Sequence, residues 1–142
     1  MNNNKIIGVI GSGTMGNGIA HVSALSGYSV LLVDVNEKLL KRAMDTISSN
    51  LSKQVSKGII SEGDKISTLN NIHVTDSMTD VENADLVIEA VPENKEIKNK
   101  VFSDLDSICK PDTILASNTS SISITDIAER TNRPNKIIGM HF

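Results

Sequence analysis

Two periods of hydrophobic and polar positions alternate along this chain, and they predict its secondary structure. Short, continuous apolar runs are typical of strands buried on both faces. These runs lie at residues 6–10, 29–33, 72–75, 85–90, 113–116 and 136–140. Between them, apolar residues recur at helical spacing. This spacing predicts helices at 14–26, between Asn36 and Gly58, after Ser61, at 96–109 and at 124–130.

The alternation of strands and helices predicts a doubly wound α/β fold, with a mostly parallel six-stranded sheet and helices on both faces. No repeat or linker interrupts the pattern, so residues 1–142 are expected to form one domain. The helical spacing also predicts which residues face the core. On two of the helices these are Met15, Ile19, Ala20, Val22 and Leu25, and Ile97, Val101, Leu105 and Ile108.

A glycine-rich turn joins the first predicted strand to the first predicted helix. It reads Gly11-Ser-Gly-Thr-Met-Gly16, the spacing that a dinucleotide's diphosphate requires between a strand and a helix. Gly11 allows the tight turn, Gly13 lets the diphosphate approach the backbone, and Gly16 lets the helix pack closely. With Thr14 and Met15, these glycines are expected to bind the cofactor on unpaired N–H groups. The fold expected is therefore of the Rossmann type.

An acidic residue, Asp34, ends the second predicted strand, 18 residues after Gly16. A carboxylate at this place accepts hydrogen bonds from the hydroxyls of a ribose. It would repel a 2′-phosphate, and the neighbouring Val35 and Asn36 provide no cation to bind one. The sequence therefore predicts NAD as the cofactor in preference to NADP.

Composition and charge narrow the possible functions further. The net charge of −3 provides no field that attracts phosphates broadly, so nucleic acid is not an expected partner. No apolar run approaches the about 20 residues that span a bilayer, and no signal peptide precedes the first strand, so no membrane is expected. The single cysteine, Cys109, cannot form an internal disulfide, which favours a cytoplasmic location. No metal site is expected.

Polar groups follow three of the predicted strands, at the edge where such sheets bind ligands. Glu93 follows the run at 85–90, the segment 117–121 follows the next strand, and His141 follows the last. Serine and asparagine clusters commonly form turns and caps. A histidine at this edge can take and give a proton near neutral pH. On spacing alone, a catalytic and a structural role for His141 stay equally open.

Five segments spread over nearly the whole chain match one protein family. They are Val9-Ile-Gly-Ser-Gly-Thr-Met-Gly16, Asp85-Leu-Val-Ile-Glu-Ala-Val91, Ile108-Cys-Lys-Pro111, Ile114-Leu-Ala-Ser-Asn-Thr-Ser-Ser121 and Ile137-Ile-Gly-Met-His-Phe142. On these segments the chain resembles the N-terminal half of the 3-hydroxyacyl-CoA dehydrogenases, and particularly the bacterial 3-hydroxybutyryl-CoA dehydrogenases. The Ala-Ser-Asn-Thr-Ser-Ser and Gly-Met-His-Phe segments are highly specific to this family.

The resemblance implies hydride transfer between NAD and carbon 3 of a short-chain 3-hydroxyacyl-CoA, a reaction of fatty-acid and butyrate metabolism. His141 would exchange the hydroxyl proton, while Ser120 and Asn118 would contact the substrate oxygen and the cofactor. Glu93 and Lys98 match positions on the cofactor side, and Lys98 could also reach an acyl-CoA phosphate.

Two further lysines, Lys53 and Lys57, are four residues apart and hence lie on one helix face. The resemblance suggests that this face binds the CoA nucleotide, and a solvated helix surface is the equal alternative. The family continues beyond this length with a glutamate that pairs with the histidine and with a helical second domain. Without them we expect NAD binding with little turnover, and either self-association or contact with a partner that supplies the C-terminal domain.

Two other functions compete with this one. The chain could be a binding module that holds NAD or acyl-CoA, or docks a separate C-terminal partner, without catalysis. It could also be an NAD enzyme that acts on a free 3-hydroxy acid with a lysine base. The segment 117–121 and His141 argue against this last possibility.

Overall fold

A computed structural model describes residues 5–119 and 122–140 of the chain. In this part of the chain six strands form one fully parallel sheet in the order β3-β2-β1-β4-β5-β6. The strands are β1 (Ile6–Ile10), β2 (Ser29–Val33), β3 (Ile72–Thr75), β4 (Leu86–Glu89), β5 (Ile114–Ser117) and β6 (Ile137–Gly139). The strand order reverses between β1 and β4, which confirms the predicted doubly wound, Rossmann-type sheet.

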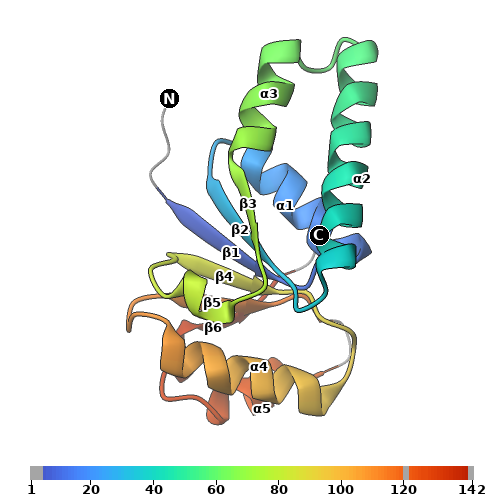
Figure 1. Cartoon of the computed structure of the whole chain (residues 1–142). Helices are drawn as coiled ribbons and strands as arrows, with labels where there is room; N and C mark the ends of the chain where they lie inside the picture. The colour runs from blue at the N-terminus through green and yellow to red at the C-terminus, as the bar shows by residue number, and fades with distance from the viewer. Residues whose placement is uncertain (1–4, 120–121, 141–142) are drawn as a thin grey trace.

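Helices cover the two faces of the sheet unequally (Figure 1). In chain order they are α1 (Thr14–Leu25), α2 (Glu37–Ser56), α3 (Glu62–Asn70), η1 (Met78–Val81), α4 (Lys95–Ile108), α5 (Ile124–Glu129) and η2 (Pro134–Lys136), where η marks a 3₁₀ turn. The first three pack on one face, over β1–β3, and α4 and α5 pack on the other, over β4–β6. None of the helices in the described ranges has both the length and the apolar character needed to cross a membrane.

Polar caps determine where the helices begin. The side chain of Asn36 accepts hydrogen bonds from the N–H groups of Lys38 and Leu39 and so starts α2. Ser61 and Asp64 form a complete capping box at α3, as their spacing predicts. Asn94 caps α4 by accepting from an N–H in its first turn, so this helix starts one residue earlier than predicted.

The core forms two layers, one on each side of the sheet. Between the sheet and α1–α3, the fully buried residues include Val9, Ile19, Leu32, Ile47 and Leu51. Between the sheet and α4–α5, they include Val87, Phe102, Leu105, Leu115 and Ile127. Burying each such side chain contributes about 1.5–3 kcal/mol, so these layers fix the positions of the strand ends that carry the polar groups.

Three helix residues that were predicted to face the core are exposed instead. The exposed fractions are 41% for Met15, 56% for Val22 and 45% for Ile97. Met15 lies in the first turn of α1, within the glycine-rich segment 11–16. Val22 and Ile97 line two surface cavities. Helical spacing identified apolar faces correctly here, but it carries no information on whether another element covers them.

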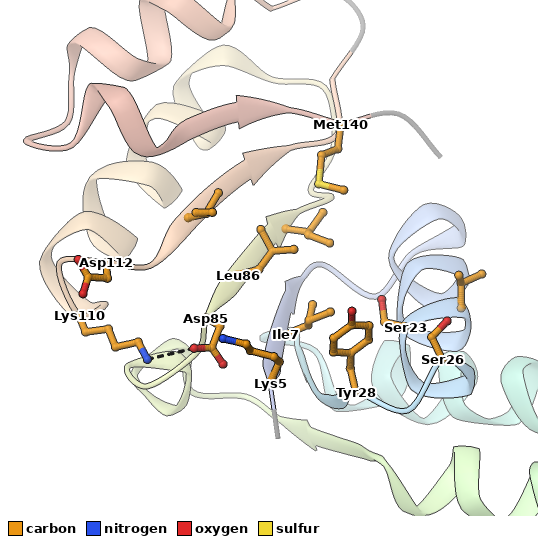
Figure 2. Close-up of a pocket in the computed structure, with 13 residues that line it drawn as sticks. Lys5, Ile7, Ser23, Ser26, Tyr28, Asp85, Leu86, Lys110, Asp112 and Met140 are labelled. Atoms are coloured by element: carbon orange, nitrogen blue, oxygen red, sulfur yellow. Dashed lines mark hydrogen bonds and ion pairs between the residues drawn. The ribbon is translucent and has the colours of Figure 1, made fainter. Parts of the chain in front are cut away.

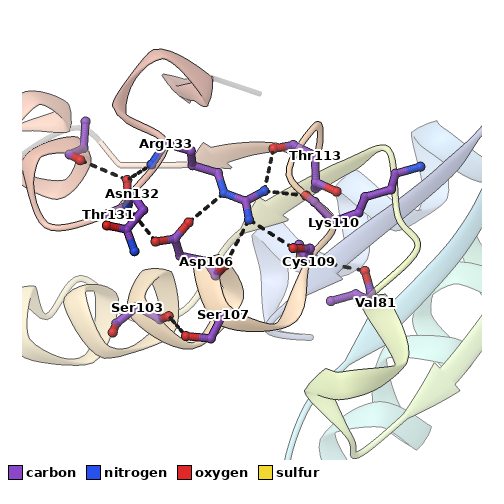
Figure 3. A network of polar contacts seen from close by, with 11 residues as sticks. Val81, Ser103, Asp106, Ser107, Cys109, Lys110, Thr113, Thr131, Asn132 and Arg133 are labelled. Atoms are coloured by element: carbon purple, nitrogen blue, oxygen red, sulfur yellow. Dashed lines mark hydrogen bonds and ion pairs between the residues drawn. The ribbon is translucent and has the colours of Figure 1, made fainter.

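The carboxyl end of α4 is closed by Arg133, which the sequence did not single out (Figure 3). Arg133 is 8% exposed, and its guanidinium donates to the carboxylate of Asp106 at 2.7 Å. It also donates to the backbone carbonyls of Asp106, Cys109, Lys110 and Thr113 at 2.7–3.1 Å. One side chain thereby donates to carbonyls of the last helical turn and of the loop that follows it.

One part of the sheet has no helix over it in the described residues. Beside α1, the face of β1, β4 and β5 borders a cavity of about 710 Å³ (Figure 2). Its floor includes Leu86, Ile88 and Ile114, and Met140 lies at its end toward the carboxyl edge. Asp85 and Lys110 form an ion pair of 3.2 Å on its rim. This face, called the open face below, is an apolar surface with a charged border.

Candidate functional site

The glycine turn between β1 and α1 has the geometry that its sequence predicts. Gly11 has a φ of +101°, a left-handed conformation that favours glycine, and a Cβ there would lie 2.7 Å from the carbonyl oxygen of Ala90. A Cβ on Gly16 would lie 1.8 Å from the carbonyl oxygen of Gly11. A Cβ on Gly13 would have no atom within 4 Å. Two glycines therefore close the turn, and the third leaves space in front of it.

This space lies at the positive end of α1. Gly13 is the N-cap of α1, and no side chain in the described residues caps the helix. The N–H groups of the first turn, from Thr14 onward, are thus available to an anion. A cavity of about 360 Å³ adjoins them, lined among others by Asn17 and Arg42. Arg42 was not predicted as a site residue. Its position on α2, two turns after Asp34, is the signal that could have identified it.

Asp34 accepts hydrogen bonds from the glycine turn and also lines a cavity. Its Oδ2 accepts hydrogen bonds from the backbone N–H of Ser12 at 3.0 Å and from Ser12 Oγ at 2.8 Å. Its Oδ1 accepts from the N–H of Asn36 at 3.1 Å. A carboxylate has about four acceptor positions, so it can also accept from a ribose hydroxyl. Asp34 therefore couples the end of β2 to the turn, a role that the sequence did not indicate.

A second, largely apolar cavity of about 370 Å³ lies beside Asp34, between β2 and the start of α4. Val35, Leu39 and Val91 are among its lining residues, together with the exposed Ile97. An apolar slot next to a ribose-binding carboxylate suits a flat heteroaromatic ring. With the turn, the helix end and Asp34, the structure therefore has the parts needed to hold a dinucleotide.

A buried group of polar side chains lies at the carboxyl ends of β4 and β5. Glu89 accepts hydrogen bonds from Lys98 Nζ and Ser117 Oγ, both at 2.6 Å. Lys98 Nζ also lies 3.2 Å from Glu93 Oε1, and Thr119 donates to Glu93 at 2.7 Å. The Lys98 side chain is 0% exposed, so the expectation that it reaches an acyl-CoA phosphate is wrong for this structure.

Sequence reasoning missed Glu89 as part of the site, and it placed the segment 117–121 at this edge without giving Ser117 a role. The signal for Glu89 was a carboxylate at the end of an otherwise apolar run in a strand buried on both faces. Such a group must be paired, because an isolated charge in the interior is strongly unfavourable. Its partners lie 9 and 28 residues further along the chain, and only the fold brings them together.

Of the three predicted catalytic residues, only Asn118 is among the described ones, and it directly follows β5 at the same edge of the sheet. Asn118 is half-buried, and its N–H donates to the carbonyl oxygen of Glu89 at 2.9 Å. Ser120 and His141 lie outside the described residues. Met140, which precedes His141 in the sequence, donates its N–H to Ser117 O at 3.0 Å.

Lys53 and Lys57 are both exposed and lie near the C-terminal end of α2. At 1.5 Å per residue, Lys53 is about 25 Å along the helix from its N-cap, Asn36, which adjoins Asp34. The structure therefore places the two lysines together but far from the glycine turn. A nucleotide bound there would occupy a site separate from that of the dinucleotide.

Comparison with known proteins identifies the family. Residues 6–142 match the model of the 3-hydroxyacyl-CoA dehydrogenase NAD binding domain. The chain belongs to the 3-hydroxyacyl-CoA dehydrogenase family. It is 49% identical over 138 residues to a 3-hydroxybutyryl-CoA dehydrogenase of Bradyrhizobium diazoefficiens, and 44% identical over the same length to a probable one of Bacillus subtilis. These matches cover 97% of the chain, and NAD is the cofactor of this domain.

Solved structures of the 3-hydroxyacyl-CoA dehydrogenase family agree with this assignment. The crystal structure of (S)-3-hydroxybutyryl-CoA dehydrogenase from Ralstonia eutropha superposes with a TM-score of 0.95 at 41% identity over 99% of the chain. The chain spans about half the length of these relatives, 47–48% of the two sequences and 50% of that structure. It corresponds to their N-terminal, NAD-binding half.

Proposed function

We propose that this chain supplies the NAD-binding half of an enzyme that interconverts short-chain 3-hydroxyacyl-CoA and 3-oxoacyl-CoA. The observation that carries the proposal is the joint presence of an intact dinucleotide turn and 41–49% identity to 3-hydroxybutyryl-CoA dehydrogenases over nearly the whole chain. NAD, when bound, supplies the hydride acceptor and, in the reverse direction, the donor.

The residues of the first half of the sheet fit the cofactor. The open space before Gly13 accommodates a diphosphate, Gly11 closes the turn behind it, and the first turn of α1, with Thr14, Met15 and Gly16, presents N–H groups to it. Asp34 accepts from the ribose hydroxyls and repels a 2′-phosphate. This selectivity can be measured by calorimetric titration. We expect NADH to bind at least tenfold more tightly than NADPH, and the Asp34→Ala variant to narrow that ratio. An unchanged ratio would refute the role of Asp34.

The substrate proton is exchanged at the carboxyl ends of the strands in the second half of the sheet. We assign to the imidazole of His141 the uptake of the hydroxyl proton in the oxidising direction and its return in the other. The amide of Asn118 and the hydroxyl of Ser120 hold the substrate oxygen and stabilise charge that develops on it. Asn118 and Glu93 also contact the cofactor. The hydrogen bond from the Asn118 N–H to Glu89 supports this assignment, because it fixes the loop to β4.

The CoA nucleotide binds elsewhere, on the face of α2 that carries Lys53 and Lys57. Both lysines are exposed and share one face of the helix, so they can pair with phosphates without displacing core residues. A double Lys→Ala variant of these positions is expected to weaken CoA binding and to leave NADH binding unchanged. Unchanged CoA affinity would favour the alternative, a merely solvated helix surface.

Full activity needs a second half that is not among these 142 residues. The open face offers a place for it, because Ile114 and Val22 expose apolar surface there, and the relatives carry about as much chain again. Alternatively, a second copy of the chain covers this face. Sedimentation velocity distinguishes self-association from binding of a C-terminal partner. A reducing cytoplasm, in fatty-acid or butyrate metabolism, is the setting that the single buried thiol of Cys109 and the relatives favour.

A steady-state assay with acetoacetyl-CoA and NADH tests the proposal. The chain alone is expected to bind NADH and to turn over at least about 100-fold more slowly than the full-length Bradyrhizobium relative, because small misplacements of reacting groups have effects of that order. A rate close to that of the relative would show that the second half is dispensable. Failure to bind NADH at all would refute the cofactor assignment. The second candidate, a binding module without catalysis, is favoured if adding the C-terminal half of a relative produces no activity.

A further inference from the structure

Three side chains at the carboxyl ends of β4 and β5 form a polar contact inside the protein. Glu89 Oε1 accepts from Ser117 Oγ at 2.6 Å, and Glu89 Oε2 accepts from Lys98 Nζ at 2.6 Å. The same oxygen, Oε2, accepts from the N–H of Val91 at 2.7 Å. All three side chains are buried completely. We call Glu89, Lys98 and Ser117 the buried triad; it joins β4, β5 and α4.

Stability alone does not explain a buried ion pair at this place. Removing two charges from water costs about as much as their attraction returns, so apolar residues of similar volume would hold β4 against α4 equally well or better. On the same helix as Lys98, the side chains of Val101, Phe102 and Leu105 are already buried in an apolar cluster. The buried triad is therefore better explained by the directions of its hydrogen bonds than by its net free energy.

The hydrogen bonds of the buried triad continue into two loops at the carboxyl edge of the sheet, where ligands bind. Lys98 Nζ lies 3.2 Å from Glu93 in the loop after β4, and Glu93 accepts from Thr119 in the loop after β5 at 2.7 Å. Thr119 in turn accepts from the N–H of Ile122 at 3.2 Å. The backbone of Ser117, within the triad, accepts from the N–H of Met140. The residues around Asn118 and before His141 are thus linked to one buried carboxylate.

We propose that the buried triad positions the loops after β4 and β5 so that they bind the nicotinamide end of the cofactor. This inference rests on the proposed function. In a doubly wound sheet each half receives one nucleotide. Asp34 places the adenosine on β1–β3, so the ends of β4–β6 receive the nicotinamide nucleotide. Lys98 then acts through Glu93 and the loop after β5, with its own ammonium held inside the protein.

Comparing two ligands separates positioning from folding. NADH contacts both halves of the sheet, whereas ADP carries only the adenosine and the diphosphate. The test variants are Glu89→Gln, which keeps the shape and removes the charge, and Ser117→Ala, which removes one hydrogen bond and keeps the ion pair. Asp106→Asn is the matched control, because it alters the buried pair with Arg133 at the opposite end of the same helix, α4.

We expect Glu89→Gln to weaken NADH binding by tenfold or more and Ser117→Ala to weaken it by fivefold or more. Both variants should bind ADP within twofold of the wild-type affinity. The control should lower the melting temperature and leave both affinities unchanged at a temperature where every variant is folded. If Glu89→Gln does not fold, Ser117→Ala decides the question, since it retains both charges.

Four results would overturn the inference. If NADH and ADP lose affinity in parallel, the triad has only a structural role. If folded Ser117→Ala binds NADH as the wild type does, the triad does not position the second half. The inference is also refuted if the wild-type chain binds NADH no more tightly than ADP. A wild-type chain that binds neither ligand refutes the cofactor assignment itself, and the positioning role with it.

Discussion

Two alanine substitutions in the glycine turn separate cofactor binding from folding. In Gly13→Ala the new methyl group meets no protein atom within 4 Å, and the φ of −70° at this position suits alanine. Replacing glycine at an N-cap by alanine destabilises the helix by about 1 kcal/mol, and the less flexible unfolded chain returns about 0.4–1 kcal/mol. The stability of this variant should therefore stay within about 1 kcal/mol of the wild type.

Binding should respond very differently to Gly13→Ala. The methyl group enters the space before the turn and keeps a diphosphate oxygen beyond hydrogen-bonding distance of the N–H groups. A hydrogen bond to a charged group contributes about 1.5–3 kcal/mol, so losing one weakens NADH binding by about 10- to 150-fold. In Gly16→Ala, by contrast, the methyl group would lie 1.8 Å from the carbonyl oxygen of Gly11. Overpacking of this kind costs about 1–3 kcal/mol or more.

The assay pairs NADH titration with thermal unfolding for both variants. Gly13→Ala should lose affinity and keep its melting temperature, whereas Gly16→Ala should melt lower, by about 4 °C for each kcal/mol. The reasoning fails if Gly13→Ala binds NADH normally, because the space before the turn would then not be where the diphosphate lies. It also fails if Gly16→Ala is as stable as the wild type.

Three further predictions concern the frame around the site. Arg133→Ala removes the ion pair with Asp106 and the donor to four backbone carbonyls, and it should lower the free energy of unfolding by about 3–5 kcal/mol in denaturant titration; a loss below about 1 kcal/mol would contradict the cap. The hydrogen bond from the N–H of Ile6 lowers the pKa of Asp85. The ionised Asp85 carboxylate therefore stabilises the fold above its unfolded pKa of about 3.9, and this stabilisation is lost as the pH falls through the lower folded pKa. Asp85→Asn should flatten the decline in melting temperature over that acid range. An identical decline in variant and wild type would count against this role of Asp85. Burial raises the pKa of the Cys109 thiol, so a thiol reagent should modify it only as fast as the chain opens; modification at the rate of a denatured control would be inconsistent with this.

Most strand bounds and helix starts could be predicted from the sequence, because local patterns determine them. The bounds of β1, β2 and β3 follow from apolar runs bordered by polar residues, and the starts of α2 and α3 follow from Asn36 and Ser61. The conformations of the turn glycines follow from spacing in the same way, because a strand, a turn and a helix in this order leave few backbone solutions.

The interior of the site could not be predicted, because it depends on contacts between distant segments. The apolar run of β4 indicates that Glu89 is buried, but not that Lys98 reaches it. A lysine near a helix start is usually solvated, and for this reason its role was misjudged. Val22 shows the complementary limit, since an apolar residue on a helix face is a core residue only when a second element covers it.

A crystal structure of the chain grown with NADH tests the central claim most directly. The account predicts the diphosphate against the N–H groups at the start of α1, from Gly13 to Gly16, with the adenosine ribose on the carboxylate of Asp34. Cofactor bound to another surface, with the turn between β1 and α1 left vacant, would contradict it.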